Sequence, residues 1–255
     1  MDAEIVVPAL ALRDDTGRLN EAATAGYAAR AVNTWVDRFL LSGTTTRGDR
    51  MTLEERATVL DIWLDVAPPT RLLAGCWVAS DFDQAQQRGV APIVVMRDLA
   101  DRTAALAFLR SLPVGAYVYS HPAHSPVILD GELCAAVREA GFLPAGAKVA
   151  KVRPPELRAV RSATGESFAL WDASSRNIAG SLAAGASGVV ATPLSPFAPH
   201  TPPRDLDTLQ PVLNAVQYEL DGLGEAAARR DYLHALAASP LDPWVRSGGP
   251  KQNAR

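Results

Sequence analysis

Cysteine is scarce in this 255-residue sequence, which contains only Cys76 and Cys134. The two lie far apart with no CxxC or Cys/His spacing, which argues against a disulfide framework or a zinc site, and we expect both to fill small spaces in the core. Basic clusters are also missing, because 25 Lys and Arg against 28 Asp and Glu give a formal net charge of -3. No stretch of Lys and Arg could follow a phosphate backbone, so we expect no nucleic-acid partner.

Long hydrophobic runs are absent too. No segment approaches the roughly 20 apolar residues that a membrane span needs. The N-terminus carries Asp2 and Glu4 where a secretory signal would have a basic region before an apolar run. We therefore expect a cytoplasmic protein without a membrane partner. Because 48% of the residues are hydrophobic, the chain can bury one large core, and we expect a single domain.

Short aliphatic runs alternate with longer amphipathic segments through most of the sequence. Runs bounded by turn residues predict strands at residues 4–10, 38–42, 71–76, 92–96, 115–119, 144–150, 167–172 and 188–192. Apolar positions three or four apart predict helices at 20–37, 52–66, 81–88, 98–112, 130–140, 154–162, 176–184, 206–220 and 225–238. Asn20 is the predicted N-cap of the first helix, and Thr52 with Glu55 forms the capping box of the second.

Eight strands alternating with helices indicate an α/β fold. We predict a (β/α)8 TIM barrel over residues 1–200, with a short C-terminal helical extension over 201–255 that packs on the same domain. The alternative is an open doubly wound sheet, although no GxGxxG follows the first strand. Residues 193–205 are expected to form a proline-rich loop and residues 247–255 a frayed tail.

In such a barrel the active site lies at the carboxyl ends of the strands, so the polar residues that close each strand are the candidates. Lys148 ends a short apolar run. Burial disfavours the charged form of a lysine, so its amine can act as the nucleophile that forms a Schiff base with a ketone. The alternative is a lysine that extends to solvent, which is how we interpret Lys151 three positions later.

Other strand ends carry hydroxyl groups and histidines. Thr44 and Thr45 can hold a carboxylate through their hydroxyl and backbone N–H groups, or form an ordinary turn. Tyr119 closes the fifth predicted strand and can relay protons, or lie at the rim as an aromatic contact. His121 and His124 are spaced i, i+3, but no further ligand in the sequence completes a metal site. We therefore expect no metal.

These residues resemble the dihydrodipicolinate synthase and N-acetylneuraminate lyase family, whose members are (β/α)8 barrels that form a Schiff base between pyruvate and a lysine. Gly43-Thr44-Thr45 looks like the family's carboxylate-binding loop, and Tyr119-Ser-His-Pro122 like its Y-N-x-P segment with the proton-relaying tyrosine. Gly146-Ala-Lys148 looks like the strand that carries the Schiff-base lysine, and Gly188-Val-Val-Ala191 like the strand beside the pyruvate. The resemblance spans roughly residues 4 to 195.

The resemblance implies Lys148 and Tyr119 as catalytic residues. It implies substrate binding by five further residues: Thr44, Thr45, His124, Trp171 and Ala191. No metal or organic cofactor is implied. The family also implies a homo-oligomer, a dimer or a tetramer, although the short third unit and C-terminal region put the tetramer in question.

The chain departs from the family pattern at several positions. Thr46-Arg47 stands where Gly-Glu usually follows, and Val95-Met96-Arg97 stands where the synthases carry a tyrosine pair. His124 takes the place of the arginine that holds the second substrate's carboxylate. Trp171 replaces a glycine, and we expect its ring to project into the mouth of the pocket and favour a small acceptor. The alternative is that the ring folds sideways into the barrel wall.

Together these features predict a Schiff-base-forming lyase or aldolase that acts on pyruvate or another 2-oxo acid, with an aldehyde as a candidate second substrate. The departures indicate that it is not the lysine-pathway synthase. The alternative from another class is a catalytically degenerate barrel that serves as a binding or partner subunit.

Overall fold

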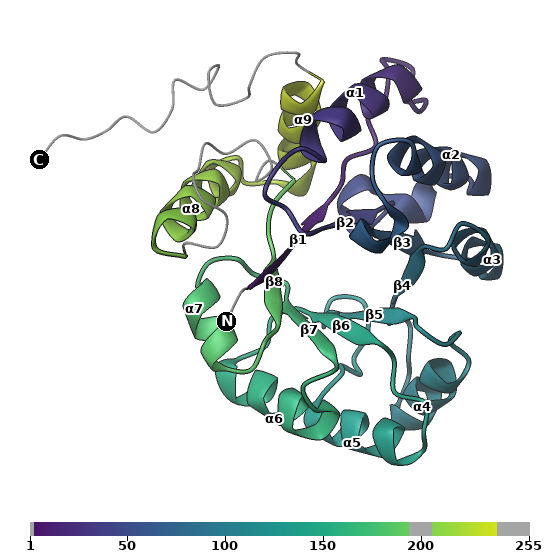
Figure 1. The fold of residues 1–255 in the computed structure, drawn as a ribbon, viewed down its shortest axis with the longest axis vertical. Helices are drawn as coiled ribbons and strands as arrows, with labels where there is room; N and C mark the ends of the chain where they lie inside the picture. Colours follow the sequence, from purple (N-terminus) through teal and green to yellow (C-terminus); the bar gives the residue numbers. More distant parts are fainter. Residues whose placement is uncertain (1–2, 194–205, 239–255) are drawn as a thin grey trace, which may run out of the picture.

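Eight parallel strands close into a barrel, and helices cover its outside (Figure 1). A computed structural model describes residues 3–193 and 206–238 of the chain. Each strand pairs with the next in sequence, and the ring is closed where Glu4, Ile5 and Val6 of the first strand pair with Gly188, Val189 and Val190 of the last. The predicted (β/α)8 fold is confirmed.

The strands are short, and each lies within or overlaps one predicted run. They are β1 (Glu4–Pro8), β2 (Arg38–Leu41), β3 (Leu72–Cys76), β4 (Ala91–Val95), β5 (Tyr117–Ser120), β6 (Gly146–Val149), β7 (Ala169–Asp172) and β8 (Gly188–Val190). Several predictions were too long because apolar residues continue beyond the hydrogen-bonded ladder. Leu10, for example, follows β1 and is buried without being part of it.

The helices also follow the predicted order. They are α1 (Glu21–Ala31), α2 (Leu53–Leu64), α3 (Ala79–Gln87), α4 (Arg102–Arg110), α5 (Gly131–Glu139), α6 (Pro154–Thr164), α7 (Ile178–Ala183), α8 (Leu206–Gly222) and α9 (Ala226–Ala237), with short 3-10 turns η1 (Thr44–Thr46), η2 (Gly48–Arg50) and η3 (Pro69–Arg71). The predicted start of the fourth helix at Asp98 is wrong. Asp101 is its N-cap, whereas Asp98 has a φ of 56° and donates its backbone N–H to the carbonyl of His124.

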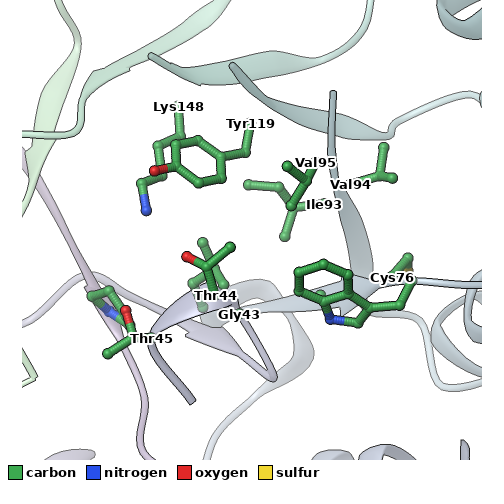
Figure 2. A pocket seen from close by; sticks show the side chains of 13 residues that line it. Gly43, Thr44, Thr45, Cys76, Ile93, Val94, Val95, Tyr119 and Lys148 are labelled. Carbon is green, nitrogen blue, oxygen red and sulfur yellow. The ribbon is translucent and has the colours of Figure 1, made fainter. Parts of the chain in front are cut away.

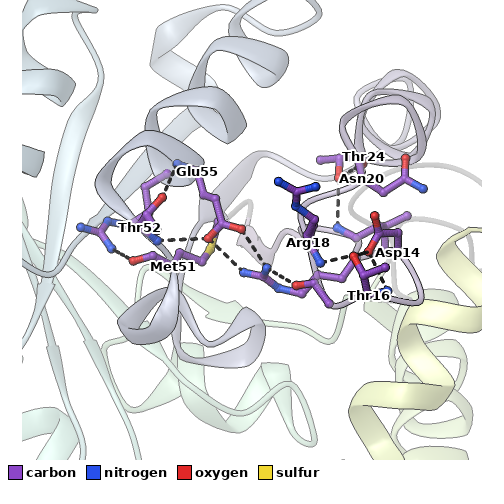
Figure 3. Close-up of polar contacts among 12 residues, drawn as sticks. Asp14, Thr16, Arg18, Asn20, Thr24, Met51, Thr52 and Glu55 are labelled. Carbon is purple, nitrogen blue, oxygen red and sulfur yellow. Dashed lines mark hydrogen bonds and ion pairs between the residues drawn. The ribbon is translucent and has the colours of Figure 1, made fainter.

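The predicted capping box at the start of α2 is confirmed, and one of its residues also contacts the loop after β1. Thr52 accepts the backbone N–H of Glu55 at 3.0 Å, and the Glu55 carboxylate accepts the N–H of Thr52 at 3.1 Å. The same carboxylate pairs with Arg13 at 2.9 Å, which ties the start of α2 to the loop after β1 (Figure 3). In that loop Asp14 accepts the N–H groups of Thr16 and Arg18, so the chain is fixed before Asn20 caps α1.

Side chains along each strand alternate between two apolar layers. On β6, Ala147 and Val149 pack outward with the helices, while Lys148 points into the barrel beside Tyr119 of β5. The barrel interior is filled by a separate group of buried residues: Val6, Leu40, Leu73, Ile93, Val95, Tyr119, Ala150, Trp171 and Val190. This alternation determines which strand residues can reach the site.

The C-terminal helices α8 and α9 lie outside the barrel between α7 and α1 (Figure 1). Leu213, Val216 and Leu233 belong to the same group of buried apolar residues as Tyr27 of α1. The predicted proline-rich loop after residue 193 and the predicted tail at 247–255 lie outside the described residues. None of the described helices combines the length and the apolar character that crossing a bilayer requires.

Candidate active site

Lys148 lies in the barrel interior near the carboxyl ends of the strands. Its residue is only 7% exposed, and no carboxylate of the described residues is within ion-pair distance. Burial lowers the pKa of this amine from 10.5 to about 8. About a tenth of the amine is therefore neutral at pH 7, and the neutral amine is the state that attacks a carbonyl carbon.

Tyr119 is the residue paired with Lys148 across the β5–β6 ladder. The Lys148 Nζ lies 4.0 Å from the centroid of the Tyr119 ring. Burial raises the pKa of the Tyr119 hydroxyl to about 12, so the phenol keeps its proton at neutral pH and can donate it. The two side chains that the sequence analysis named as catalytic therefore lie in contact.

A narrow slot opens beside the amine. Lys148 points into the space between Tyr119 and the turn that carries Thr44 and Thr45 (Figure 2). The slot also has an apolar side made by Leu40, Cys76, Trp77, Ile93 and Val95. It holds only about 20 Å³, which restricts it to a small group.

The turn after β2 fixes the two threonines. Thr46 donates its hydroxyl to the carbonyl of Gly43 at 3.2 Å, which leaves Thr44 and Thr45 as the two threonines of the turn that line the slot. Gly48 has no room for a side chain, because a Cβ would lie 1.7 Å from the carbonyl oxygen of Ser42. Close packing therefore holds the turn against β2 and gives the slot a rigid polar end.

The slot connects to a larger cavity of about 720 Å³ over the mouth of the barrel. Both include Lys148, Tyr119, Thr44 and Thr45 in their lining. Ala191 lines the larger cavity, as does Lys151, which is exposed as the sequence analysis expected. The structure thus brings together five of the seven residues named from the sequence as catalytic or substrate-binding.

Trp171 is not at the mouth, so the expected position of its ring is wrong. The side chain is fully buried inside the barrel, and its indole N–H donates to Glu4 Oε2 at 2.7 Å. The ring stacks on Tyr117 with the centroids 5.1 Å apart, and the Arg38 guanidinium lies 5.7 Å from the indole centroid. Trp171 therefore fills the amino-terminal end of the barrel rather than gating the pocket.

The stagger of the strands explains this position. Trp171 pairs with Gly188, the first residue of β8, and Gly188 pairs with Glu4, the first residue of β1. A residue near the end of β7 is therefore level with the beginnings of the next two strands. A Cβ on Gly188 would lie 1.9 Å from the carbonyl oxygen of Glu4, so this corner of the barrel is closely packed. The ring therefore neither packs sideways into the barrel wall nor projects into the mouth.

The two histidines after β5 lie beside Tyr119 but have different surroundings. The rings of His121 and His124 are each centred 5.9 Å from the Tyr119 ring. His121 lines the larger cavity, and its Nδ1 accepts the backbone N–H of Ala123. Burial, together with the charges of nearby His124, Lys148 and Lys151, lowers the pKa of His121.

His124 lines neither the slot nor the cavity, so its expected contact with a second substrate is not seen. No group of three or more potential metal ligands occurs among the described residues.

Sequence reasoning missed the contribution of the C-terminal region. Arg229 and Arg230 of α9 line the larger cavity with Gln217 and Leu220 of α8. Helical periodicity alone could not show that these helices lie beside the mouth of the barrel. Cys76 was interpreted as core filling, yet it lines the slot; burial raises the pKa of its thiol to about 12, so it is protonated and a poor nucleophile.

Solved structures that share this fold include two aldolases and a protein in complex with pyruvate. A sialic acid aldolase from Ruminococcus gnavus is 16% identical with a TM-score of 0.69, covering 92% of this chain and 79% of its own. A 2-keto-3-deoxygluconate aldolase variant from Sulfolobus solfataricus is 14% identical with a TM-score of 0.72, covering 94% and 87%. A prophage protein of the dihydrodipicolinic acid synthase family from E. coli K12, in complex with pyruvate, is 17% identical with a TM-score of 0.65, covering 91% and 80%. No model of a known protein family and no curated protein matches the sequence.

Proposed function

We propose that this chain is a divergent member of the dihydrodipicolinate synthase and N-acetylneuraminate lyase family. In this proposal it is a class I lyase or aldolase that forms a Schiff base with pyruvate or another 2-oxo acid. The observation that carries the proposal is the buried Lys148 amine, with a pKa of about 8, in a slot that it shares with Tyr119, Thr44 and Thr45. The sialic acid and 2-keto-3-deoxygluconate aldolases of the same fold support the reaction class, and the prophage protein bound to pyruvate supports the substrate class.

The slot has the polarity that a small 2-oxo acid needs. Thr44 and Thr45 provide hydroxyl and backbone N–H donors for the carboxylate at one end, and the apolar side chains of Ile93 and Val95 face the methyl end. The ketone carbon then lies at the Lys148 amine. Because the slot is narrow, the remainder of a longer substrate extends into the larger cavity.

The chemistry follows from these placements. The neutral Lys148 amine attacks the ketone carbon, and Tyr119 supplies the proton that allows the carbinolamine oxygen to leave as water. The resulting iminium withdraws electrons, so the bond between the neighbouring carbon and a hydroxyl-bearing carbon can break. The hydroxyl proton passes to the Tyr119 phenolate, the far fragment leaves as an aldehyde, and the electron pair of the broken bond is held as an enamine. Protonation of the enamine and addition of water release the keto acid and restore the amine. The bond-forming direction uses the same steps in reverse, with an aldehyde as acceptor.

The proposal excludes the lysine-pathway synthase reaction. Val95 stands in the slot near the place where the synthases carry a relay tyrosine, and an aliphatic side chain transfers no proton. His124, at the position of their carboxylate-binding arginine, lies outside the lining of the cavity. The second substrate of this protein is therefore held by other groups.

Deuterium exchange separates an enzyme from a binding subunit. An enzyme that forms an enamine exchanges the methyl protons of pyruvate in D2O, which proton NMR records directly. We expect exchange that Tyr119→Phe slows by about 10² to 10⁴ and that Lys148→Met abolishes. Binding of pyruvate without any exchange would instead favour the catalytically degenerate alternative.

A further inference from the structure

We infer that the larger cavity binds a second anionic group, a carboxylate or a phosphate, at its α8–α9 side through Arg230, Arg229 and Lys151. This inference rests on the proposed function and specifies its substrate class: a 2-oxo acid whose far end is also anionic. The site is distinct from the Thr44–Thr45 turn, which lies at the other end of the substrate.

The cavity is strongly basic in a chain with an acidic balance. Its lining includes the basic side chains of Lys148, Lys151, Arg176, Arg229 and Arg230. One carboxylate, Asp172, lines it, whereas the whole chain has a formal net charge of -3. Concave surfaces lined by charge of one sign concentrate ligands of the opposite sign.

The single carboxylate does not neutralise these cations. Asp172 Oδ2 accepts the hydroxyl of Ser181 at 2.7 Å, and Oδ1 accepts the backbone N–H of Ser174 at 3.1 Å. Both carboxylate oxygens therefore already accept hydrogen bonds, one from the loop after β7 and one from α7. Asp172 forms no ion pair with a cation of the cavity in the described part of the chain.

Arg230 and Lys151 are unpaired among the described residues, and Arg229 is only weakly paired. Arg176 is paired with Asp221 at 2.5 Å, and Arg229 reaches the same carboxylate only at 3.9 Å. The Nε of Arg229 is buried and has no hydrogen-bond partner among the described residues. Arg230 and Lys151 form no ion pair in the described ranges 3–193 and 206–238. A carboxylate or phosphate in the cavity would form charge-assisted hydrogen bonds with the lining guanidinium and ammonium groups of Arg229, Arg230 and Lys151.

The size of the cavity agrees with a ligand longer than pyruvate. Cavities of about 300 to 1,000 Å³ hold ligands of drug size, and this one measures about 720 Å³. In the proposed function the 2-oxo acid end binds at Lys148, where the slot and the cavity meet, so the rest of the cavity and its positive charge are left for the far end of the substrate. Because Arg229 and Arg230 come from α9, the C-terminal extension provides this half of the site.

The test uses the full chain and compares two acids of equal length, 2-oxoadipate with an anionic far end and 2-oxohexanoate with a methyl end. The concentration that gives half-maximal borohydride trapping is measured for each. We expect it to be about tenfold lower for 2-oxoadipate, the difference that one charge-assisted contact provides. Arg230→Gln should remove most of that preference and leave trapping of pyruvate unchanged, whereas Arg230→Lys should retain part of it. Arg158→Gln, an exposed site on α6, is the matched control.

Calorimetry with glutarate and with inorganic phosphate tests the site without Schiff-base chemistry. Binding of either that weakens about tenfold in Arg230→Gln supports the inference even if no 2-oxo acid is trapped, in which case only the proposed function fails. Stronger binding of glutarate identifies a carboxylate site, and stronger binding of phosphate a phosphate site. Trapping that occurs with an equal preference in the wild type and Arg230→Gln, or anion binding that is unchanged by Arg230→Gln, overturns the inference.

Discussion

The Nζ of Lys148 lies over the face of the Tyr119 ring, 4.0 Å from its centroid, and the two residues are directly paired on neighbouring strands. The ring face attracts the charged ammonium, while burial favours the neutral amine. Burial lowers the pKa of the Lys148 amine to about 8. Both protonation states are therefore accessible near neutral pH, as a Schiff-base lysine requires.

The pH dependence of imine formation follows from this pKa. Only the neutral amine attacks a ketone, so the rate of trapping with pyruvate and cyanoborohydride should rise with pH and level off above about 8. An unperturbed lysine would show a rise centred near 10.4 instead. The rate measured between pH 6 and 10 decides between the two, and a midpoint close to that of free lysine would contradict the proposed burial effect.

Removing the buried amine should stabilise the fold. The pKa of Lys148 is lowered on folding from 10.5 to about 8, so between these values the unfolded chain binds more protons. The stability of the wild type therefore rises with pH through this window, and the full cost is present below pH 8. Lys148→Met should raise the free energy of unfolding at pH 7 by on the order of 3 kcal/mol.

The gain should shrink as the pH rises from 8 towards 10.5. The exposed neighbour Lys151 gives the control, because Lys151→Met should change stability by only about 0.5 kcal/mol. Urea unfolding at two pH values measures both effects. A loss of stability in Lys148→Met at pH 7 would show that the amine is favourably bound instead.

Trp171 should support the barrel and not select the substrate. Trp171→Phe removes the hydrogen bond to Glu4 and should lower the free energy of unfolding by about 1 to 3 kcal/mol. Trp63→Phe is the matched control, because Trp63 is equally buried and its indole N–H has no partner among the described residues. The concentration of pyruvate for half-maximal trapping should not change. If Trp171→Phe accepted a wider range of aldehydes, the Trp171 ring would have to limit the substrate pocket, which would contradict this prediction.

Dihydrodipicolinate synthase activity should be negligible. The side chain at Val95 provides no hydroxyl group, and loss of a positioned proton relay costs about 10² to 10⁴ in rate. A coupled assay with pyruvate and aspartate semialdehyde measures this directly. Turnover at about 10 per second, which is ordinary for an enzyme, would mean that another group relays the proton.

The sequence was most informative where a residue's role depends on strand order. Apolar runs separated by capped helices were enough to predict the barrel. The polar residues at or just after the ends of β2, β5 and β6 were enough to predict Thr44, Tyr119 and Lys148 as site residues. A parallel barrel brings all of its strand ends to one face, so position along the chain is enough to place these side chains together.

It was least informative where the role depends on the stagger of the barrel or on distant packing. Trp171 is next to last in β7, but the register of β7 with β8 and β1 places its ring at the amino-terminal end of the barrel. The stagger is a property of the closed ring and leaves no local pattern. Arg230 is likewise an ordinary helical residue until α9 packs against the mouth.

Peptide mapping after borohydride reduction in the presence of pyruvate tests the central claim most directly. The account predicts that the mass of one reduced pyruvate adduct appears on the peptide containing Lys148, that Lys148→Met abolishes it, and that Lys151→Met retains it. No adduct under these conditions, or an adduct that persists in Lys148→Met, would contradict the assignment of Lys148 as the Schiff-base residue.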